Sequence, residues 1–128
     1  MFFYTSGFNF VFQLLSKLVL IQYYNCMHKI TVLYHHPQDP EAFERYYEEH
    51  HLPLAQNMPG VSKIEFTKFV TTPSGHQPDF YRMAELYFSS EEQMIETMGT
   101  PEGQATIDDL NNFTGAPVKV LIGTVEVN

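Results

Sequence analysis

Apolar and polar residues alternate in four segments of this chain, and the alternation predicts four β-strands. The predicted strands cover residues 29–36, 61–70, 80–88 and 116–128. In the first of them Ile30, Val32 and Tyr34 point to one face, because successive side chains of a strand point to opposite faces. Proline and glycine in residues 71–79 predict a loop between the second and third strands.

Helical spacing replaces alternation between the first and second strands, and again between the third and fourth. Residues 39–58 form the first predicted helix. Asp39 is a good N-cap for it, and Pro40 suits its first position. Pro53 cannot donate a hydrogen bond to the carbonyl of Glu49, so we expect a kink or a break there. Residues 89–99 predict a second helix, and residues 100–113 predict a short further helix.

The order of these elements, β-α-β-β-α-β, predicts an α+β fold in which an antiparallel sheet carries its helices on one face. The third strand has bulky residues on both faces, with Arg82, Ala84, Leu86 and Phe88 on one and Tyr81, Met83, Glu85 and Tyr87 on the other. The face without helices therefore needs a cover. A second subunit would supply it, so we predict a homodimer.

Residues 1–26 differ in composition from the rest of the chain, since they hold no acidic residue and one basic residue, Lys17. A secretory signal, a lipoprotein signal and a membrane span all fit poorly. A secretory signal would need a basic N-terminal region, and a lipoprotein signal would need small residues before Cys26. A membrane span would need an uninterrupted apolar run, and all three features are missing. We therefore expect a leader of residues 1–26, translated from upstream sequence, and a domain of residues 27–128 that starts at Met27. An ordered leader would form an amphipathic helix.

Composition and charge narrow the range of partners. The chain has 15 acidic and seven basic residues, a net charge of −8 and no basic patch, which argues against nucleic acid and membrane surfaces as partners. The aromatic share of 15% favours a core or a pocket wall built from large flat side chains. The one cysteine, Cys26, allows no disulfide within the chain, which fits a reducing, cytoplasmic setting.

Two tyrosines, two glutamates and two histidines gather in residues 46–51, shortly before Pro53. Adjacent residues of a helix point about 100° apart, so one of His50 and His51 can line the interior while the other meets water. Tyr47 precedes His51 by one turn, and a phenol and an imidazole on one face can relay or orient a proton. A single histidine is more often structural or solvated, so this cluster is a hypothesis.

We expect no metal site. None of the six histidines has another at the i, i+4 spacing of a helix-borne site, and His35 and His36 point to opposite faces of a strand. Arg82 could hold an anionic group or pair with an acid such as Glu44, and pairing is the default. Asp109 could reach a pocket, although a helix end is the commoner setting for such an acid.

Three stretches, residues 43–61, 80–94 and 108–127, resemble the EthD family, which is named for ethyl tert-butyl ether degradation. An H-x-P-L element begins at His51, and an acidic element is formed by Asp109, Asn112, Phe113 and Thr114. The resemblance covers residues 27–128 and leaves the leader outside. It implies a ferredoxin-like protomer of the dimeric α/β barrel superfamily, with a ligand held between sheet and helices. The wider superfamily includes cofactor-free lactone isomerases, polyketide cyclases and small monooxygenases, but isomerases that rely on a cysteine find no match here.

The leading hypothesis is a small cytoplasmic dimer that acts on a hydrophobic or aromatic oxygenated small molecule in a catabolic or secondary-metabolism pathway. The chemistry would be acid–base catalysis of isomerase, cyclase or dehydratase type, without a cofactor. His51 would be the general acid or base, Tyr47 would orient it or stabilise an oxyanion, and Asp109 would be a secondary polar contact.

Ligand contacts are expected from His50, Arg82, Tyr34 and Phe113. Two alternatives stay open. One is an accessory protein that binds or delivers a hydrophobic metabolite, and the other is a dimeric interaction module without a ligand.

Overall fold

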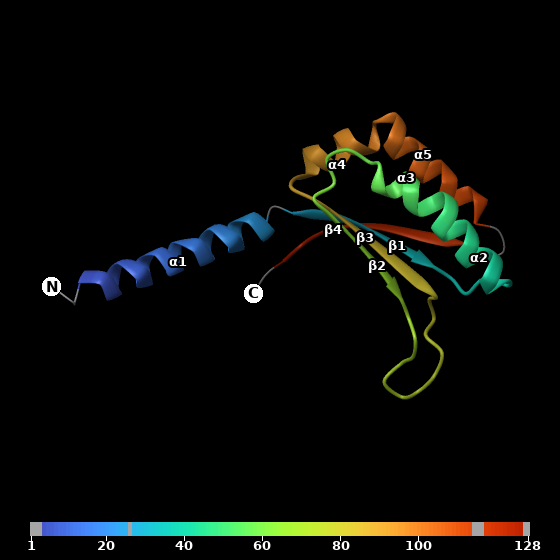
Figure 1. Ribbon diagram of the computed structural model, residues 1–128, viewed down its shortest axis with the longest axis horizontal. Helices are drawn as coiled ribbons and strands as arrows, with labels where there is room; N and C mark the ends of the chain where they lie inside the picture. Colours follow the sequence, from blue (N-terminus) through green and yellow to red (C-terminus); the bar gives the residue numbers. More distant parts are fainter. Residues whose placement is uncertain (1–3, 26, 114–116, 127–128) are drawn as a thin grey trace.

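A computed structural model describes residues 4–25, 27–113 and 117–126, and it confirms the predicted order of elements (Figure 1). The strands are β1 (His28–Tyr34), β2 (Lys63–Lys68), β3 (Arg82–Phe88) and β4 (Val118–Thr124). The helices of the domain are α2 (Pro40–Tyr46), α3 (Leu52–Gln56), α4 (Glu91–Met98) and α5 (Pro101–Asp109). A π-helical turn η1 (Tyr47–His51) joins α2 to α3, and a 3₁₀ turn η2 (Leu110–Asn112) follows α5. Residues 116, 127 and 128 of the predicted fourth strand lie outside the described residues.

The four strands form one antiparallel sheet in the order β2-β3-β1-β4, which is the ferredoxin-like arrangement. Helices α2 to α5 all lie over one face of this sheet (Figure 1). The strand residues that point at the helices are buried: Ile30, Val32 and Tyr34 on β1, and Ala84, Leu86 and Phe88 on β3. The predicted α+β class with helices on one face is therefore confirmed.

Side-chain caps define where the helices start. Asp39, Ser90 and Thr100 each accept a hydrogen bond of 3.1 Å from the backbone N–H three residues further on. These N–H groups have no partner within the helix, and a capping oxygen satisfies them. Pro40 and Pro101 follow two of the caps, where a missing N–H costs nothing.

The expected disturbance before Pro53 is the π-helical turn. The N–H of Leu52 bonds the carbonyl of Tyr47, five residues back rather than four. Pro53 has no N–H to donate, so the helix widens before it and resumes as α3. Within the widened turn Tyr47 and His51 both face inward, and they are 1% and 4% exposed. The helix is thus widened ahead of the proline rather than ended by it.

One part of the strand prediction is wrong. Alternation predicts Tyr81 on the same face as Met83, but Tyr81 precedes β3 and is buried on the helix side. Its ring packs edge-on against Phe43 of α2, with centroids 5.3 Å apart, and its hydroxyl donates to Glu44. Regular pairing of β3 with β1 begins only at Arg82, so the alternation does not extend back to Tyr81.

The amino-terminal helix α1 (Tyr4–Asn25) extends away from the sheet and its helices (Figure 1). The side chains of residues 9–20 are exposed, whereas Met27, which follows the helix closely, is 5% exposed. The predicted leader helix is therefore present, and the domain boundary at residue 27 stays a prediction. Of the helices described, none has both the length and the apolar character to cross a membrane.

Candidate active site

His51 is buried in the π-helical turn, and both of its ring nitrogens have partners. Nδ1 lies 2.7 Å from Oδ2 of Asp109, and Nε2 lies 3.1 Å from the hydroxyl oxygen of Tyr34. Asp109 ends α5 and Tyr34 ends β1, so three separate elements meet at the imidazole. We call this hydrogen-bonded row, Asp109–His51–Tyr34, the relay.

The carboxylate of Asp109 is surrounded by donors. The hydroxyl of Tyr46 and the amide of Asn112, at 3.0 Å, donate to Oδ1, while His51 bonds Oδ2. Burial alone would raise the pKa of Asp109, but these hydrogen bonds outweigh burial and hold the pKa below its ordinary value. An ionised Asp109 can only accept, which places the imidazole proton on Nδ1 and leaves Nε2 as an acceptor.

The imidazole of His51 is neutral at pH 7. Burial lowers its pKa by more than the hydrogen bond and the charge of Asp109 raise it. Burial also raises the pKa of Tyr34 far above its ordinary value, and Tyr47 and Asp109 add to that effect. The hydroxyl of Tyr34 therefore stays protonated and donates a hydrogen bond to Nε2 of His51.

Tyr47, which the sequence suggests as the phenol beside His51, contacts the imidazole through its ring. The two rings stack with centroids 5.8 Å apart and planes 29° apart. The hydroxyl of Tyr47 is buried and has no hydrogen-bond partner among the described residues. Burial raises the pKa of Tyr47 to about 12, although the Arg82 guanidinium, 4.8 Å from the ring centroid, works against the rise. The phenol that bonds Nε2 is that of Tyr34.

Sequence reasoning gave no role to the two groups that hold Asp109. Asn112 belongs to the same acidic element as Asp109 and Tyr46 lies next to Tyr47, but neither pattern assigns these side chains to the carboxylate. For Tyr34 a signal existed, because strand alternation aims it at the helices together with Ile30 and Val32. That signal gives the direction of the side chain but not its distance from His51.

A cavity of about 380 Å³ lies between the sheet and the helices, and His51 and Tyr34 form part of its wall. Thr106 is also polar, whereas the rest of the wall consists of apolar side chains such as Val32, Phe66 and Met98. No charged side chain is among the described residues that line this cavity. The relay therefore ends at this apolar cavity, in which hydrogen bonds to a ligand are stronger than in water.

The remaining predicted ligand residues lie at different distances from this cavity. Phe113 packs edge-on against His51, with ring centroids 4.9 Å apart. His50 is exposed, packs on Tyr46 and does not line the cavity. Arg82 donates to both carboxylate oxygens of Glu44, at 3.1 and 2.5 Å, so the predicted pairing is confirmed. Thr114 lies outside the described residues.

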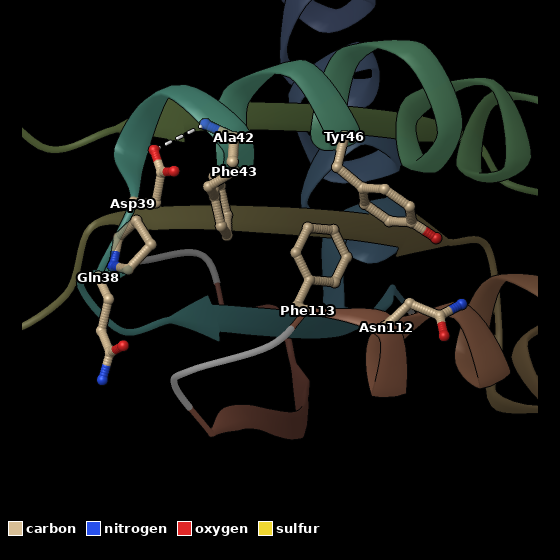
Figure 2. Close-up of a pocket in the computed structure, with 8 residues that line it drawn as sticks. Gln38, Asp39, Ala42, Phe43, Tyr46, Asn112 and Phe113 are labelled. Atoms are coloured by element: carbon tan, nitrogen blue, oxygen red, sulfur yellow. Dashed lines mark hydrogen bonds between the residues drawn. The ribbon is translucent and has the colours of Figure 1, made fainter.

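A second cavity, of about 420 Å³, adjoins the carboxylate end of the relay (Figure 2). Tyr46 and Phe43 of α2 pack against Phe113 in its wall, with ring centroids 5.4 and 5.1 Å from that of Phe113. Asn112 is exposed at its edge, and both Asn112 and Tyr46 bond Asp109. One end of the relay is thus near solvent, while the other faces the apolar cavity.

Within residues 4–25, 27–113 and 117–126, no group of three or more His, Cys, Asp or Glu side chains could hold a metal ion. Three histidines outside the strands bond other groups. His35 bonds the carbonyl of Pro117 at 2.5 Å, His36 that of Pro78 at 2.6 Å, and His76 the hydroxyl of Ser74 at 2.9 Å. These histidines therefore serve local structure.

Comparison with known proteins identifies the family, because a model of the EthD domain matches residues 35–117. The chain belongs to the EthD family. It is 36% identical over 95 residues to an uncharacterised 11.0 kDa protein from the thcB-thcC intergenic region of Rhodococcus erythropolis, covering 74% of this chain and 91% of that protein. An EthD family protein of Bacillus halodurans has a crystal structure similar to this EthD domain, with a TM-score of 0.71 and 35% identity over 76% of this chain and 96% of that one. The resemblance inferred from the sequence is thus confirmed.

More distant solved structures share only the fold of this EthD domain. A hydroxynitrile lyase from Passiflora edulis has a TM-score of 0.64 and 11% identity over 81% of this chain and 97% of its own. SnoaB, a cofactor-independent oxygenase from Streptomyces nogalater, has a TM-score of 0.54 and 10% identity over 80% and 94%. A dimeric protein of unknown function and ferredoxin-like fold from Bacteroides fragilis has a TM-score of 0.54 and 16% identity over 77% and 95%.

Proposed function

We propose that this protein binds a hydrophobic, oxygenated small molecule and moves a proton on it without a cofactor, as an isomerase, cyclase or dehydratase does. The observation that carries the proposal is the relay, in which a carboxylate, an imidazole and a phenol bond in sequence and end at an apolar cavity. At neutral pH Asp109 is ionised, His51 is neutral and Tyr34 is protonated. Those are the states that a general base and its two partners require.

In the proposed reaction, Nε2 of His51 removes a proton from a carbon atom next to a carbonyl group. The electron pair of the C–H bond becomes part of a C=C bond, and the carbonyl oxygen becomes an enolate oxygen. Tyr34 turns its O–H from Nε2 to that oxygen and stabilises the negative charge. Asp109 stabilises the imidazolium, as the acid of a catalytic triad does. Return of the proton to a different atom completes an isomerisation.

The neighbours of the relay would hold it in one geometry. Tyr47 stacks on one face of the imidazole and Phe113 packs against it edge-on, so the ring has little freedom to turn. Tyr46 and Asn112 hold the carboxylate from its other side. A fold shared with a cofactor-independent oxygenase and a hydroxynitrile lyase supports small-molecule chemistry as its use.

We further propose that the protein acts as a cytoplasmic homodimer whose functional unit is residues 27–128. Leu121 is 55% exposed and, by strand register, shares with Leu33 the face of the sheet that no described helix covers. A second copy would cover this face, and a relative of the same fold is described as dimeric. Light scattering at micromolar concentration tests the dimer, and a monomer there would contradict it.

Deuterium exchange tests the chemistry without knowledge of the natural substrate. The protein is incubated in D₂O with a panel of cyclic, acyclic and aryl ketones, and NMR follows deuteration of the carbon next to the carbonyl. We expect the wild type to accelerate exchange of at least one ketone, and His51→Gln to slow that exchange by about 100-fold or more. The matched control is His50→Gln, which alters the exposed neighbour and should keep the wild-type rate. Ketones that bind without faster exchange would overturn catalysis and favour the accessory binding protein.

A further inference from the structure

A second hollow adjoins the cavity at the relay. The 380 Å³ cavity and a hollow of about 340 Å³ share three wall residues, Ile30, Met98 and Ile122. The other walls of the hollow come from α4, from Gly99 after it and from Gln104 of α5. The two spaces therefore adjoin between the sheet and the helices, and we call them together the trough.

The trough runs along the strands away from the relay. Ile30 precedes Tyr34 by four residues on β1, a distance of about 13 Å at roughly 3.3 Å per residue. On β4, Ile122 pairs with Ile30 and Val120 pairs with Val32, so both strands offer an apolar strip on the same face. The polar groups of His51 and Tyr34 thus lie near one end of the trough, and aliphatic side chains of β1 and β4 line the trough towards its other end.

The far end of the trough is open, although apolar side chains form most of its walls. Ile122 is 65% exposed and Ile95 of α4 is 63% exposed, even though both face this hollow. Among the described residues that line either part of the trough, none carries a charge. An apolar ligand that covers Ile122 and Ile95 removes apolar surface from water. A charged ligand would lose its hydration without gaining a partner.

We propose that the ligand of this site is an elongated, uncharged molecule with an oxygen-bearing head and an apolar tail. The head meets His51 and Tyr34, and the tail passes Val32 and Ile30 and leaves between α4 and β4 at Ile122. The position of the head rests on the proposed function, whereas the path of the tail rests on the trough alone.

A series of methyl ketones, from hexan-2-one to dodecan-2-one, measures the path of the tail. Ligand-observed NMR gives the dissociation constant of each ketone with the wild-type protein. We expect the constant to fall about three- to fourfold for each added methylene that the trough buries. We also expect each fatty acid anion to bind at least about tenfold more weakly than the ketone of equal length. The described residues that line the trough include no positively charged side chain to pair with the carboxylate.

Ile122→Gln makes the far end of the trough polar at an exposed position, where the fold tolerates it. We expect this variant to bind hexan-2-one as the wild type does and to lose the gain for the longest ketones. The matched control is Val70→Gln, at a position that is 86% exposed and lines neither part of the trough, and it should keep the gain. An affinity independent of chain length, or an equal gain in Ile122→Gln, would overturn the proposal.

Two further results separate this proposal from the proposed function. Rising affinity with chain length but no deuteration supports the trough and overturns the proton transfer. Deuteration of short ketones with no rise in affinity overturns the trough alone. Light scattering of Ile122→Gln gives the last check, because loss of a dimer would mean that a second copy, and not a ligand, covers Ile122.

Discussion

Nδ1 of His51 lies 2.7 Å from Oδ2 of Asp109, although 58 positions separate the two residues in the chain. Both side chains are buried, at 5% and 8% exposure. The pair joins the π-helical turn to the end of α5, and it decides which ring nitrogen carries the proton. A substitution that keeps the shape of either side chain can therefore test its chemistry without removing its packing.

Asp109→Asn is expected to reverse the tautomer of His51. The amide of an asparagine can donate to Nδ1, which moves the imidazole proton to Nε2 and removes the base. The rate of ketone deuteration at pH 7 should fall by about 100-fold or more, and ¹⁵N NMR of the imidazole should report the change. Asp108→Asn, at an exposed neighbouring position, should alter neither. A normal tautomer and rate in Asp109→Asn would contradict the role of the carboxylate.

Two tyrosine variants distinguish the phenol that acts from the phenol that packs. Tyr34→Phe removes the donor to Nε2 and to the enolate oxygen, so the deuteration rate should fall by about 100-fold. Tyr47→Phe keeps the ring that stacks on His51 and removes a buried hydroxyl without a described partner. We expect it to keep the rate and the thermal stability of the wild type. The reverse pattern would assign the acting phenol to Tyr47.

Mild acidification is expected to destabilise the fold through His51. Burial lowers its folded-state pKa below the ordinary 6.5, so the unfolded chain binds more protons in the window beneath that value. The free energy of unfolding therefore falls as the pH drops through this window, by at most about 1.4 kcal/mol per pH unit. The lowered pKa of Asp109 adds a further loss only as the pH falls below the ordinary 3.8.

Urea titrations between about pH 5 and pH 7 measure this slope. His51→Gln should flatten it, whatever its effect on stability at pH 7, while His50→Gln should keep it. Equal slopes in the wild type and in both variants would contradict a buried neutral imidazole at position 51.

Gly103→Ala is expected to separate α5 from α4. A Cβ at Gly103 would lie 2.2 Å from the carbonyl oxygen of Thr97, a backbone atom that cannot rotate away. We expect the free energy of unfolding to fall by about 1–3 kcal/mol. Gly123→Ala is the control, since no described atom lies within 4 Å of its added Cβ, and it should change stability by less than about 0.5 kcal/mol. Thermal melts of both variants check this, and equal losses would contradict the close contact.

Much of this fold was predictable because the signals are local. Alternation in β1 and β3, the N-caps Asp39 and Thr100 and the missing N–H of Pro53 each act within a few residues. Tyr81 marks the limit of such reasoning. The face of the sheet to which Tyr81 points depends on where β3 begins to pair with β1. That starting point is set by both strands together and cannot be found from the pattern of one strand.

The same division runs through the site. The sequence by itself determined the order of strands and helices, the turn before Pro53 and a histidine that could face inward, because backbone hydrogen bonding and side-chain direction are set by near neighbours. Only the tertiary structure decided that His51 bonds Tyr34 and Asp109, and that Tyr47 packs beside it instead. Those contacts join residues 17 and 58 positions apart. They arise where sheet register and helix packing bring β1, the π-helical turn and α5 together, and no local pattern encodes such a distance.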